Sequence, residues 1–551
     1  MQRRQFLKAS AFSTGAWLLS LRASLAAPTD SRIEILLDEP IGTISPNIYG
    51  HFTEHLGGVI YDGIWVGEDS KIPNIGGIRK QMVDRLREVQ APVIRWPGGC
   101  FADSYDWRDG IGERNKRPTR TNFWVDDPEA KRVTGNAVQL YESNAFGTAE
   151  FMRFCKLSGA APYVAANLRS LPPLQFDHWV EFCNSPAGST TLARERAAAG
   201  SAEPYNVRFW GVGNESWGCG GNFTPEAYAT EFRRLTTWVP SYGIDLAFVG
   251  SGPNNNDLDW TARFFEHIFK ERPDAGRNFF GWSAHYYTWN LSRGRTQDWV
   301  AGKGDALNFD TVDWYELFRQ ANYMEQLIHD QWAVMGSYDE QHRIKLVVDE
   351  YGPWYRPGTA LDNTHLLGQQ ATLRDALMTA LTLDIFNRNA EKIGIAANAQ
   401  LVNCLNALFF THEDHFVVSP NFYVFKMYAA HQDAEAVRIE ISAPELHYQR
   451  DGKTTDFWGL NGSASRKGNK LTLTVVNPSA GGPRQTEILL HGAAPASATA
   501  EVLTNADLHA HNTFENQAVT EPKPEPVSIN GSSLQFTFPP ASVTKLSITL
   551  S

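Results

Sequence analysis

Cysteine is scarce in this sequence of 551 residues, which contains only Cys100, Cys155, Cys183, Cys219 and Cys404. An odd number at wide, irregular spacings is not the disulfide framework of a small secreted domain. The distribution is typical of a protein that folds in a reducing cytosol, although one pair could still oxidise. The sequence also lacks a CxxC pair or a Cys/His cluster, which argues against a structural zinc site of the usual kind.

An excess of basic residues is missing as well. The chain has 50 Lys and Arg against 61 Asp and Glu, a net charge of −11 at pH 7. Phosphate backbones and anionic lipids repel such a protein, so we expect no nucleic-acid partner and no binding to membranes. The apolar run at about residues 9–21 is shorter than the roughly 20 residues that cross a bilayer.

The first 26 residues have the pattern of a targeting segment. Arg3 and Arg4 precede Phe6-Leu7-Lys8 and the short apolar run, and small residues follow at 23–26. This order is typical of a signal peptide, and the paired arginines favour the twin-arginine type, which exports folded proteins. We therefore predict a signal peptide at 1–26 and a periplasmic or secreted mature protein.

Short apolar runs alternate with longer helical patterns between about residues 45 and 410. Helical spacing is clear at 77–89, where apolar residues share one face, and again at 371–387. The candidate strands are 48–51, 92–96, 162–167, 207–210, 245–249, 280–285, 345–349 and 395–398. Eight strand–helix alternations predict an α/β fold, a closed (β/α)8 TIM barrel, with its chemistry at the carboxyl ends of the strands.

Beyond about residue 430 the spacing changes to period two, as at 437–441, 470–476 and 534–538. This alternation predicts a β-sandwich, which the strand-like segment at 32–37 also joins. We expect four parts: the signal peptide, an N-terminal strand segment at 27–48, a catalytic barrel at 49–430 and the sandwich at 431–551.

Two glutamates carry most of the functional prediction. Glu215 follows the fourth candidate strand in Gly213-Asn214-Glu215, and Glu350 follows the seventh. Two carboxylates at strand ends are what a retaining glycoside hydrolase needs, since one protonates the leaving oxygen and the other attacks the sugar. The alternative for Glu350 is a structural salt bridge at the barrel rim.

Other polar and aromatic residues lie at neighbouring strand ends. Arg95 ends the second strand and would keep Glu350 ionised. His285 and Tyr287 are two positions apart on the sixth strand, so their side chains point to the same face. There they could hydrogen-bond the nucleophilic carboxylate. His285 could instead be a satisfied core histidine. Trp354, four positions after Glu350, would wall the sugar site.

A competing pattern is His51-Phe52-Thr53-Glu54-His55, which matches the H-x-x-E-H order of inverted zinc proteases. That mechanism requires a helix, so that both histidines face one metal ion. Glycines on both sides and Pro46 upstream favour a strand followed by a loop. A sugar-binding role for Glu54 is therefore the better interpretation.

At this point the motifs resemble those of glycoside hydrolase family 51 α-L-arabinofuranosidases, from about residue 32 to the C-terminus. The similar segments, long and in order, are 50–58 (GHFTEHLGG), 95–101 (RWPGGCF), 105–112 (YDWRDGIG), 144–151 (NAFGTAEF), 213–215 (GNE), 349–352 (DEYG) and 399–403 (AQLVN). The segment at 184–202 is hard to place in this comparison and is read as a loop insertion.

The resemblance implies a retaining, exo-acting enzyme with no metal and no cofactor, in which Glu350 is the nucleophile and Glu215 the acid/base. It implies that arabinofuranose hydroxyls are held by the following residues: Glu54, Cys100, Asn214, Tyr287 and Gln400. Tyr286 competes with Tyr287 for its role, and some members have Asn where this chain has Cys100. The implied partners are arabinose-containing oligo- or polysaccharides, and the family often forms a homo-oligomer, in many cases a hexamer.

Three rival functions remain at this stage. The first is another glycosidase specificity on the same two glutamates, such as an endo-β-glucanase or xylanase. The second is a zinc hydrolase built on His51, Glu54 and His55. The third is a carbohydrate-binding protein on a barrel scaffold, which would not need both glutamates. The sequence leaves open whether arabinan, arabinoxylan or arabinogalactan is debranched.

Overall fold

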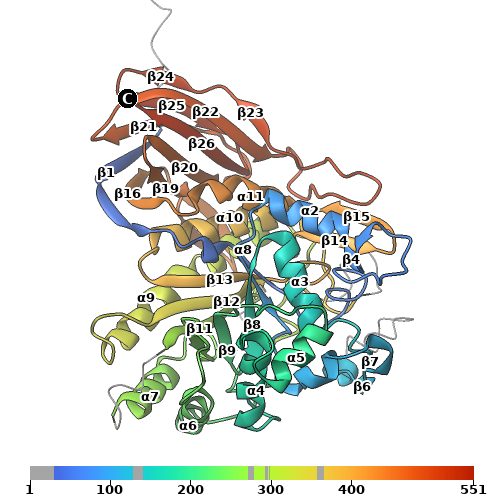
Figure 1. The fold of residues 1–551 in the computed structure, drawn as a ribbon. Helices are drawn as coiled ribbons and strands as arrows, with labels where there is room; N and C mark the ends of the chain where they lie inside the picture. Colours follow the sequence, from blue (N-terminus) through green and yellow to red (C-terminus); the bar gives the residue numbers. More distant parts are fainter. Residues whose placement is uncertain (1–29, 128–139, 271–277, 292–295, 297, 357–364) are drawn as a thin grey trace, which may run out of the picture.

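The structure is a computed structural model that describes residues 30–127, 140–270, 278–291, 296, 298–356 and 365–551. The predicted signal peptide lies outside the described residues. Figure 1 shows two regions: a barrel surrounded by helices, and a β-sheet region that contains the C-terminus.

Eight strands form a closed barrel in the order β10-β11-β12-β13-β2-β5-β8-β9, with parallel pairing throughout. The strands are β2 (Gly50–Phe52), β5 (Val93–Trp96), β8 (Ala161–Ala166), β9 (Phe209–Val212), β10 (Ala247–Gly250), β11 (Phe279–Thr288), β12 (Lys345–Pro353) and β13 (Ile393–Ala399). The predicted TIM barrel is confirmed, and each predicted strand overlaps one of these. Val93, Phe209 and Val347 belong to the apolar layer inside it, so the barrel is a packed core.

Helices surround this barrel. They are α2 (Lys80–Glu88), α3 (Thr148–Ser158), α4 (Pro173–Asn184), α5 (Thr191–Ala198), α6 (Pro225–Thr236), α7 (Leu258–Phe269), α8 (Thr311–Ala321), α9 (Tyr323–Gly336), α10 (Leu373–Arg388) and α11 (Pro420–Tyr428). The helical spacing at 77–89 comes from α2, which buries Met82, Val83 and Leu86. Every residue of α10 from Leu373 to Asn387 is buried, because this helix lies between the barrel and the sheet (Figure 1).

The segment at 184–202 is not the loop that the sequence suggested. Thr190 caps the helix α5 by accepting from the backbone N–H of Ala193. The buried Arg196 donates to the backbone oxygens of Phe182 and Ser185, each at 2.8 Å. A short helix is therefore fixed against the end of α4 by one arginine, a contact that local spacing does not reveal.

Ten strands form one continuous sheet in the order β23-β22-β26-β20-β19-β16-β1-β21-β25-β24. They are β1 (Ser31–Thr43), β16 (Glu435–Ser442), β19 (Asn461–Lys467), β20 (Lys470–Asn477), β21 (Arg484–His491), β22 (Pro495–Thr504), β23 (Lys523–Glu525), β24 (Ser528–Asn530), β25 (Ser533–Phe538) and β26 (Ser542–Leu550). β22 and β24 lie near opposite ends of this order yet contact one another, so the sheet folds back around a shared apolar core. β1 pairs antiparallel with β16 and parallel with β21.

Four small antiparallel pairs complete the described strands. They are β3 (Asn74–Ile75) with β4 (Ile78–Arg79), β6 (Arg120–Thr121) with β7 (Tyr141–Glu142), β14 (Phe409–His412) with β15 (His415–Val418), and β17 (Leu446–Arg450) with β18 (Lys453–Phe457). The division of the chain at residues 27, 49 and 431 and the homo-oligomer stay predictions. No helix in the described part of the chain has the length and apolar character needed to span a membrane.

A buried carboxyl group connects the barrel to the sheet. Asp384 of α10 accepts hydrogen bonds from Ser463 and Thr474 of the sheet, both at 2.6 Å, and from Tyr428 at 2.8 Å. Burial raises the pKa of Asp384 to about 7, although these donors oppose the rise. The three hydrogen bonds satisfy a group that would be costly to bury alone.

Candidate active site

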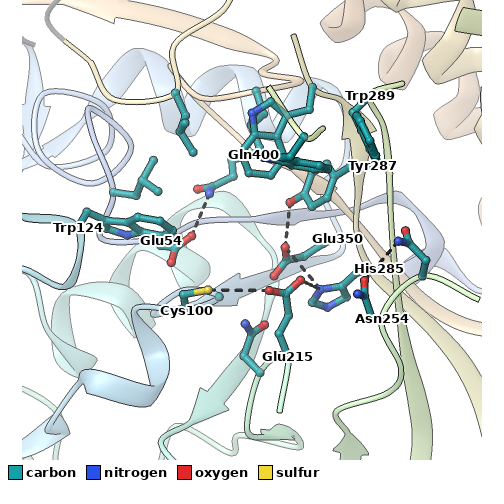
Figure 2. A pocket seen from close by; sticks show the side chains of 18 of the residues that line it. Glu54, Cys100, Trp124, Glu215, Asn254, His285, Tyr287, Trp289, Glu350 and Gln400 are labelled. Carbon is teal, nitrogen blue, oxygen red and sulfur yellow. Dashed lines mark hydrogen bonds and ion pairs between the residues drawn. The ribbon is translucent and has the colours of Figure 1, made fainter. Parts of the chain in front are cut away.

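The two predicted glutamates face one cavity of about 410 Å³ at the carboxyl ends of the barrel strands (Figure 2). Glu215 follows β9 with φ of +41°, an unusual conformation for a residue with a side chain. Its carbonyl oxygen accepts from the backbone N–H groups of Gly218 and Gly220, at 2.7 and 3.2 Å. A Cβ at position 220 would lie 1.8 Å from the carbonyl oxygen of Asn214, so this tight turn requires glycine there.

Glu350 and its neighbour Asp349 both point into the barrel, although successive residues of a regular strand alternate in direction. The register of β12 shifts against β11 between Val347 and Glu350, and against β13 between Val348 and Tyr351. Such a bulge re-aims side chains, and here it gives Asp349 and Glu350 a common set of partners.

Arg95 is the cation at the centre of this set and is almost fully buried. It donates from Nη1 to Glu350 at 2.8 Å and from Nη2 to the Asn214 Oδ1 at 2.6 Å. Its Nε lies 3.3 Å from Asp349 Oδ2. Burial lowers the pKa of Arg95, but Asp349 and Glu350 outweigh burial and raise it. The predicted pairing of Arg95 with Glu350 is thus present, together with two partners that were not predicted.

Both oxygens of Glu350 have donors. Arg95 donates to Oε1, and the Tyr287 hydroxyl donates to Oε2 at 2.8 Å. The hydroxyl of Tyr286 instead donates to the backbone oxygen of Gln320, so Tyr287 and not Tyr286 faces the cavity. These two contacts fix the orientation of the Glu350 carboxylate.

His285 lies between three carboxylates. Its Nδ1 is 3.0 Å from Glu215 Oε1 and 3.6 Å from Glu350 Oε2, and its Nε2 is 3.2 Å from Asp349 Oδ1. Burial lowers the pKa of His285, but the charge of Glu350 and the hydrogen bonds to Asp349 and Glu215 raise it to about 10. His285 is therefore an imidazolium at neutral pH, and it lies nearer to Glu215 than to the predicted nucleophile.

Asp349 was not predicted as a site residue. Tyr163 and Ser283 donate to it at 2.8 and 2.6 Å. Burial alone would raise the pKa of Asp349, but Arg95 and His285 hold it well below its usual range. One feature of the sequence could have indicated its role. Asp349 is a charged residue at the end of a buried apolar strand, and a buried charge requires a partner.

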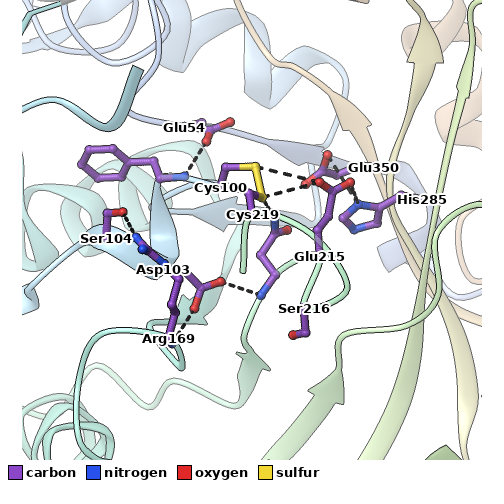
Figure 3. Close-up of a disulfide and its surroundings, with 12 residues drawn as sticks. Glu54, Cys100, Asp103, Ser104, Arg169, Glu215, Ser216, Cys219, His285 and Glu350 are labelled. Carbon is purple, nitrogen blue, oxygen red and sulfur yellow. Dashed lines mark hydrogen bonds and ion pairs between the residues drawn. A yellow bond between two sulfur atoms is a disulfide. The ribbon is translucent and has the colours of Figure 1, made fainter. Parts of the chain in front are cut away.

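Glu215 has a different environment from Glu350. Cys100 and Cys219 form a disulfide (Figure 3), and their sulfur atoms lie 3.9 and 3.6 Å from Glu215 Oε2. A disulfide has no proton to donate, so these are packing contacts. The sequence allowed one oxidised pair but did not identify it, and Cys100 was expected to hold the sugar as a single residue. Cys155, Cys183 and Cys404 are buried thiols.

Glu54 forms the opposite wall of the cavity. The backbone N–H of Phe101 donates to its Oε1 at 3.0 Å, and Gln400 donates to its Oε2 at 3.1 Å. Burial and the charge of Glu350 raise the pKa of Glu54 to about 8. Gly98 and Gly99 allow the close approach, because a Cβ at these positions would lie 2.6 Å from Glu54 Cγ and 2.8 Å from Glu350 Oε1.

Aromatic rings surround the mouth of the cavity. Trp354, predicted as a wall, packs edge to face against Tyr287 at 5.0 Å between centroids. Trp299 packs against Trp354 in the same way at 5.0 Å. Trp124, Trp217, Trp289 and Trp299 also line the cavity and were missed. Their only signal was the abundance of tryptophan, which core packing explains equally well.

The H-x-x-E-H pattern does not form a metal site. The ring of His51 packs against Phe425 at 4.8 Å, while His55 contacts Glu142 through Nδ1 at 2.8 Å and accepts from Trp96 at 3.1 Å. Among the described residues, the groups that could hold a metal ion include neither His51 nor His55. The zinc-hydrolase alternative therefore loses its structural basis.

Comparisons with known proteins agree with this geometry. Residues 85–290 match the model of the alpha-L-arabinofuranosidase 1 domain, and residues 349–542 match that of the alpha-L-arabinofuranosidase C-terminal domain. The chain is 34% identical over 534 residues to an intracellular exo-alpha-L-arabinofuranosidase of Bacteroides ovatus, covering 96% of this chain and 98% of the relative.

Solved structures resemble the whole chain. The GH51 arabinofuranosidase from Xanthomonas axonopodis pv. citri superposes with a TM-score of 0.86 at 33% identity, covering 95% of this chain and 100% of that one. The alpha-L-arabinofuranosidase from Thermotoga maritima, solved as an arabinose complex, gives a TM-score of 0.79 at 27% identity, with 94% and 100% covered.

The raised pKa of His285 predicts how stability depends on pH. The folded value of about 10 exceeds the ordinary value of 6.5, so the stabilisation is fully present below pH 6.5 and is lost as pH rises through 10. The free energy of unfolding of the wild type should therefore fall across this window relative to His285→Asn. Denaturant titrations at pH 6.5, 8 and 9.5 measure this, with His415→Asn as control. A constant difference between wild type and His285→Asn would contradict the assignment.

Proposed function

The chain belongs to glycoside hydrolase family 51 and has exo-α-L-arabinofuranosidase activity, and from this premise we propose a retaining mechanism with Glu350 as nucleophile and Glu215 as acid/base. One observation carries the proposal. Carboxylate oxygens of Glu215 and Glu350 and a nitrogen of His285 all lie within 4.8 Å of one another. Retaining enzymes place the two carboxyl groups about 5–5.5 Å apart, whereas inverting enzymes separate them by about 6.5–9.5 Å to admit a water molecule.

The surroundings of the two glutamates support the assignment of roles. Glu350 receives donors on both oxygens, from Arg95 and Tyr287, and its side chain is only 7% exposed. A fixed carboxylate of this kind suits nucleophilic attack. Glu215 is 20% exposed, and its Oε2 faces the disulfide sulfurs. That oxygen is therefore available to carry a proton to the leaving group.

Charge balance connects the two steps. Arg95 and His285 supply two positive charges, and Asp349 and Glu350 supply two negative ones while Glu215 carries the proton. Glu350 attacks the anomeric carbon, the bond to the leaving oxygen breaks, and Glu215 transfers its proton to that oxygen. Glu350 is then a neutral ester and Glu215 a carboxylate, so the buried charge is still balanced. Water then loses a proton to Glu215 and attacks the anomeric carbon, which frees Glu350 and releases arabinose.

The proposed substrates are arabinose-containing side chains of hemicellulose or pectin. Glu54, Cys100, Asn214, Tyr287 and Gln400 line the cavity. We propose that the polar groups of Glu54, Asn214, Tyr287 and Gln400 hold the hydroxyls of one arabinofuranose, and that Cys100, as part of the disulfide, only packs beside it. The indole rings that line the cavity offer apolar surface for the sugar that carries the arabinofuranose.

Substrate selectivity is the direct test of the function. The protein should release 4-nitrophenol from the α-L-arabinofuranoside with a kcat/KM at least about 100-fold above that for the β-D-xyloside or β-D-glucoside, because transition-state hydrogen bonds to hydroxyls discriminate strongly. Barley β-glucan serves as a polymer control. Preference for the xyloside or β-glucan would keep two catalytic glutamates but assign them to another sugar.

The two glutamate variants should differ from each other. Glu350→Ala should lower kcat by about 10⁴-fold or more because no covalent step remains, whereas Glu215→Ala should release a good leaving group in a rapid burst and then accumulate the arabinosyl-enzyme. Intact-mass spectrometry of Glu215→Ala would detect the adduct. Proton NMR of the wild-type reaction should show the α-anomer first. Initial β-anomer, or near-normal turnover by Glu350→Ala, would contradict the proposal.

We also propose export by the twin-arginine route, which Arg3 and Arg4 support together with the Cys100–Cys219 disulfide, since disulfides persist in oxidising compartments. The word intracellular in the description of the Bacteroides relative does not support it. In fractionated bacterial cells, activity should be periplasmic for the wild type and cytoplasmic when Arg3 and Arg4 are both changed to Lys. Wild-type activity confined to the cytoplasm, with an intact N-terminus, would refute export.

A further inference from the structure

A second group of titratable side chains lies outside the cavity. Asp62, His365 and His412 come from three separate segments: the loop after β2, the segment before α10, and the end of β14. One ligand atom from each lies within 4.8 Å of the other two. None of the three lines the active-site cavity.

The distance between two ligand atoms of this group is close to the distance between two ligands of one metal ion. Asp62 Oδ2 and His365 Nε2 are 3.4 Å apart, which exceeds the 2.7–3.2 Å of a good hydrogen bond. A tetrahedral zinc ion bound at about 2.0–2.1 Å places its ligand atoms about 3.3 Å from one another. An ion between these two atoms would therefore fit with little rearrangement.

His365 is buried in a way that leaves its chemistry unexplained. Its residue exposure is 8%, and its Nδ1 has no hydrogen-bond partner among the described residues. Gly58 makes room for the ring, since a Cβ there would lie 2.4 Å from His365 Nδ1. Nε2 lies 3.3 Å from the backbone oxygen of Thr411. Nε2 is the nitrogen that faces Asp62, so Nε2 is the atom that would bind an ion, while Nδ1 stays packed against Gly58.

The nearby arginine does not account for Asp62. Arg79 Nη2 lies 3.4 Å from Asp62 Oδ1, but the same nitrogen donates to the backbone oxygens of Asp62 and Glu413 at 2.6 and 2.7 Å. Arg79 Nε donates to Gly63 O at 3.1 Å. Backbone carbonyls thus hold Arg79, and Asp62 turns its other oxygen to His365.

We propose that Asp62, His365 and His412 bind a zinc ion, with one carboxylate oxygen, two imidazole nitrogens and a water molecule as ligands. Two histidines and a carboxylate suit zinc better than calcium or magnesium, which prefer oxygen. The ion would connect the β14–β15 hairpin to the loop that follows Glu54. Its role is structural, because none of the three ligands lines the active-site cavity.

The test uses the full-length protein, treated with a chelator and then freed of it by gel filtration. Titration with zinc sulfate in a calorimeter should show one equivalent bound by the wild type, and cobalt(II) should give the intense visible bands of a tetrahedral site. His365→Ala and His412→Ala should bind zinc at least tenfold more weakly. His415→Ala is the matched control, since His415 lies on the same hairpin but outside the group, and it should bind as the wild type does.

The melting temperature is a second measurement, and it distinguishes loss of zinc binding from poor folding of a variant. Zinc should raise the melting temperature of the wild type and of His415→Ala but not that of His412→Gln, which retains a polar side chain at the strand end. No binding by the wild type at about 10 µM zinc would overturn the proposal, because the weakest structural zinc sites, at about 10 kcal/mol, have a Kd of roughly 50 nM. Equal loss in His415→Ala and His412→Ala would also overturn it, because it would indicate a non-specific site. Hydrolysis of the arabinofuranoside at 25 °C is followed in parallel, so that failure of this proposal is distinguished from failure of the catalytic one.

Discussion

The arrangement of buried charge around Arg95 is the constraint on which the rest of the site depends. Arg95 and His285 are cations enclosed by the barrel, and burial of an unpaired charge would cost several kcal/mol. Asp349 and Glu350 balance them, and Tyr163, Ser283 and Tyr287 satisfy the remaining carboxylate oxygens. The local backbone follows this requirement. The bulge in β12 turns Asp349 and Glu350 to the same side, and Gly99 leaves room for Glu350.

Two glutamates in similar sequence contexts acquire different chemistry from their surroundings. Glu350 is held by two donors inside the barrel, whereas Glu215 lies on a tight turn beside a disulfide and is more exposed. The buried carboxylate of Asp103 fixes this turn, because it accepts a hydrogen bond from the backbone N–H of Asn214 at 2.9 Å. The same carboxylate also accepts from the backbone N–H groups of Leu168 and Arg169. Burial raises the pKa of Asp103 to about 7 despite these donors. A carboxyl that never meets the substrate thus positions Asn214 and Glu215.

The sequence was sufficient to predict the barrel and the position of both glutamates, because strand periodicity and strand-end location are local features. Residues whose roles depend on contacts across the barrel were harder to predict. Asp349 was overlooked because alternation in a regular strand would point it away from Glu350, and only the bulge reverses this. The choice between Tyr286 and Tyr287 required the register of β11. The pairing of Cys100 with Cys219 spans 119 residues, and no spacing rule links them. The helix at 191–198 depends on Arg196, and its backbone carbonyl partners, Phe182, Ser185, Ser201 and Ala202, all lie outside that helix.

The fixed cations also limit where protons can move during the proposed reaction. Arg95 keeps its charge throughout the accessible pH range, and His285, with a pKa of about 10, keeps its charge near neutrality. Asp349 stays ionised for the same electrostatic reason. In the proposed steps the change of charge therefore takes place on Glu215 and Glu350, one gaining negative charge as the other loses it. His285 contacts both carboxylates, so the same imidazolium can stabilise whichever of them is ionised. A neutral residue at this position could not do so, which explains why a charged histidine lies at the point where the two glutamates meet.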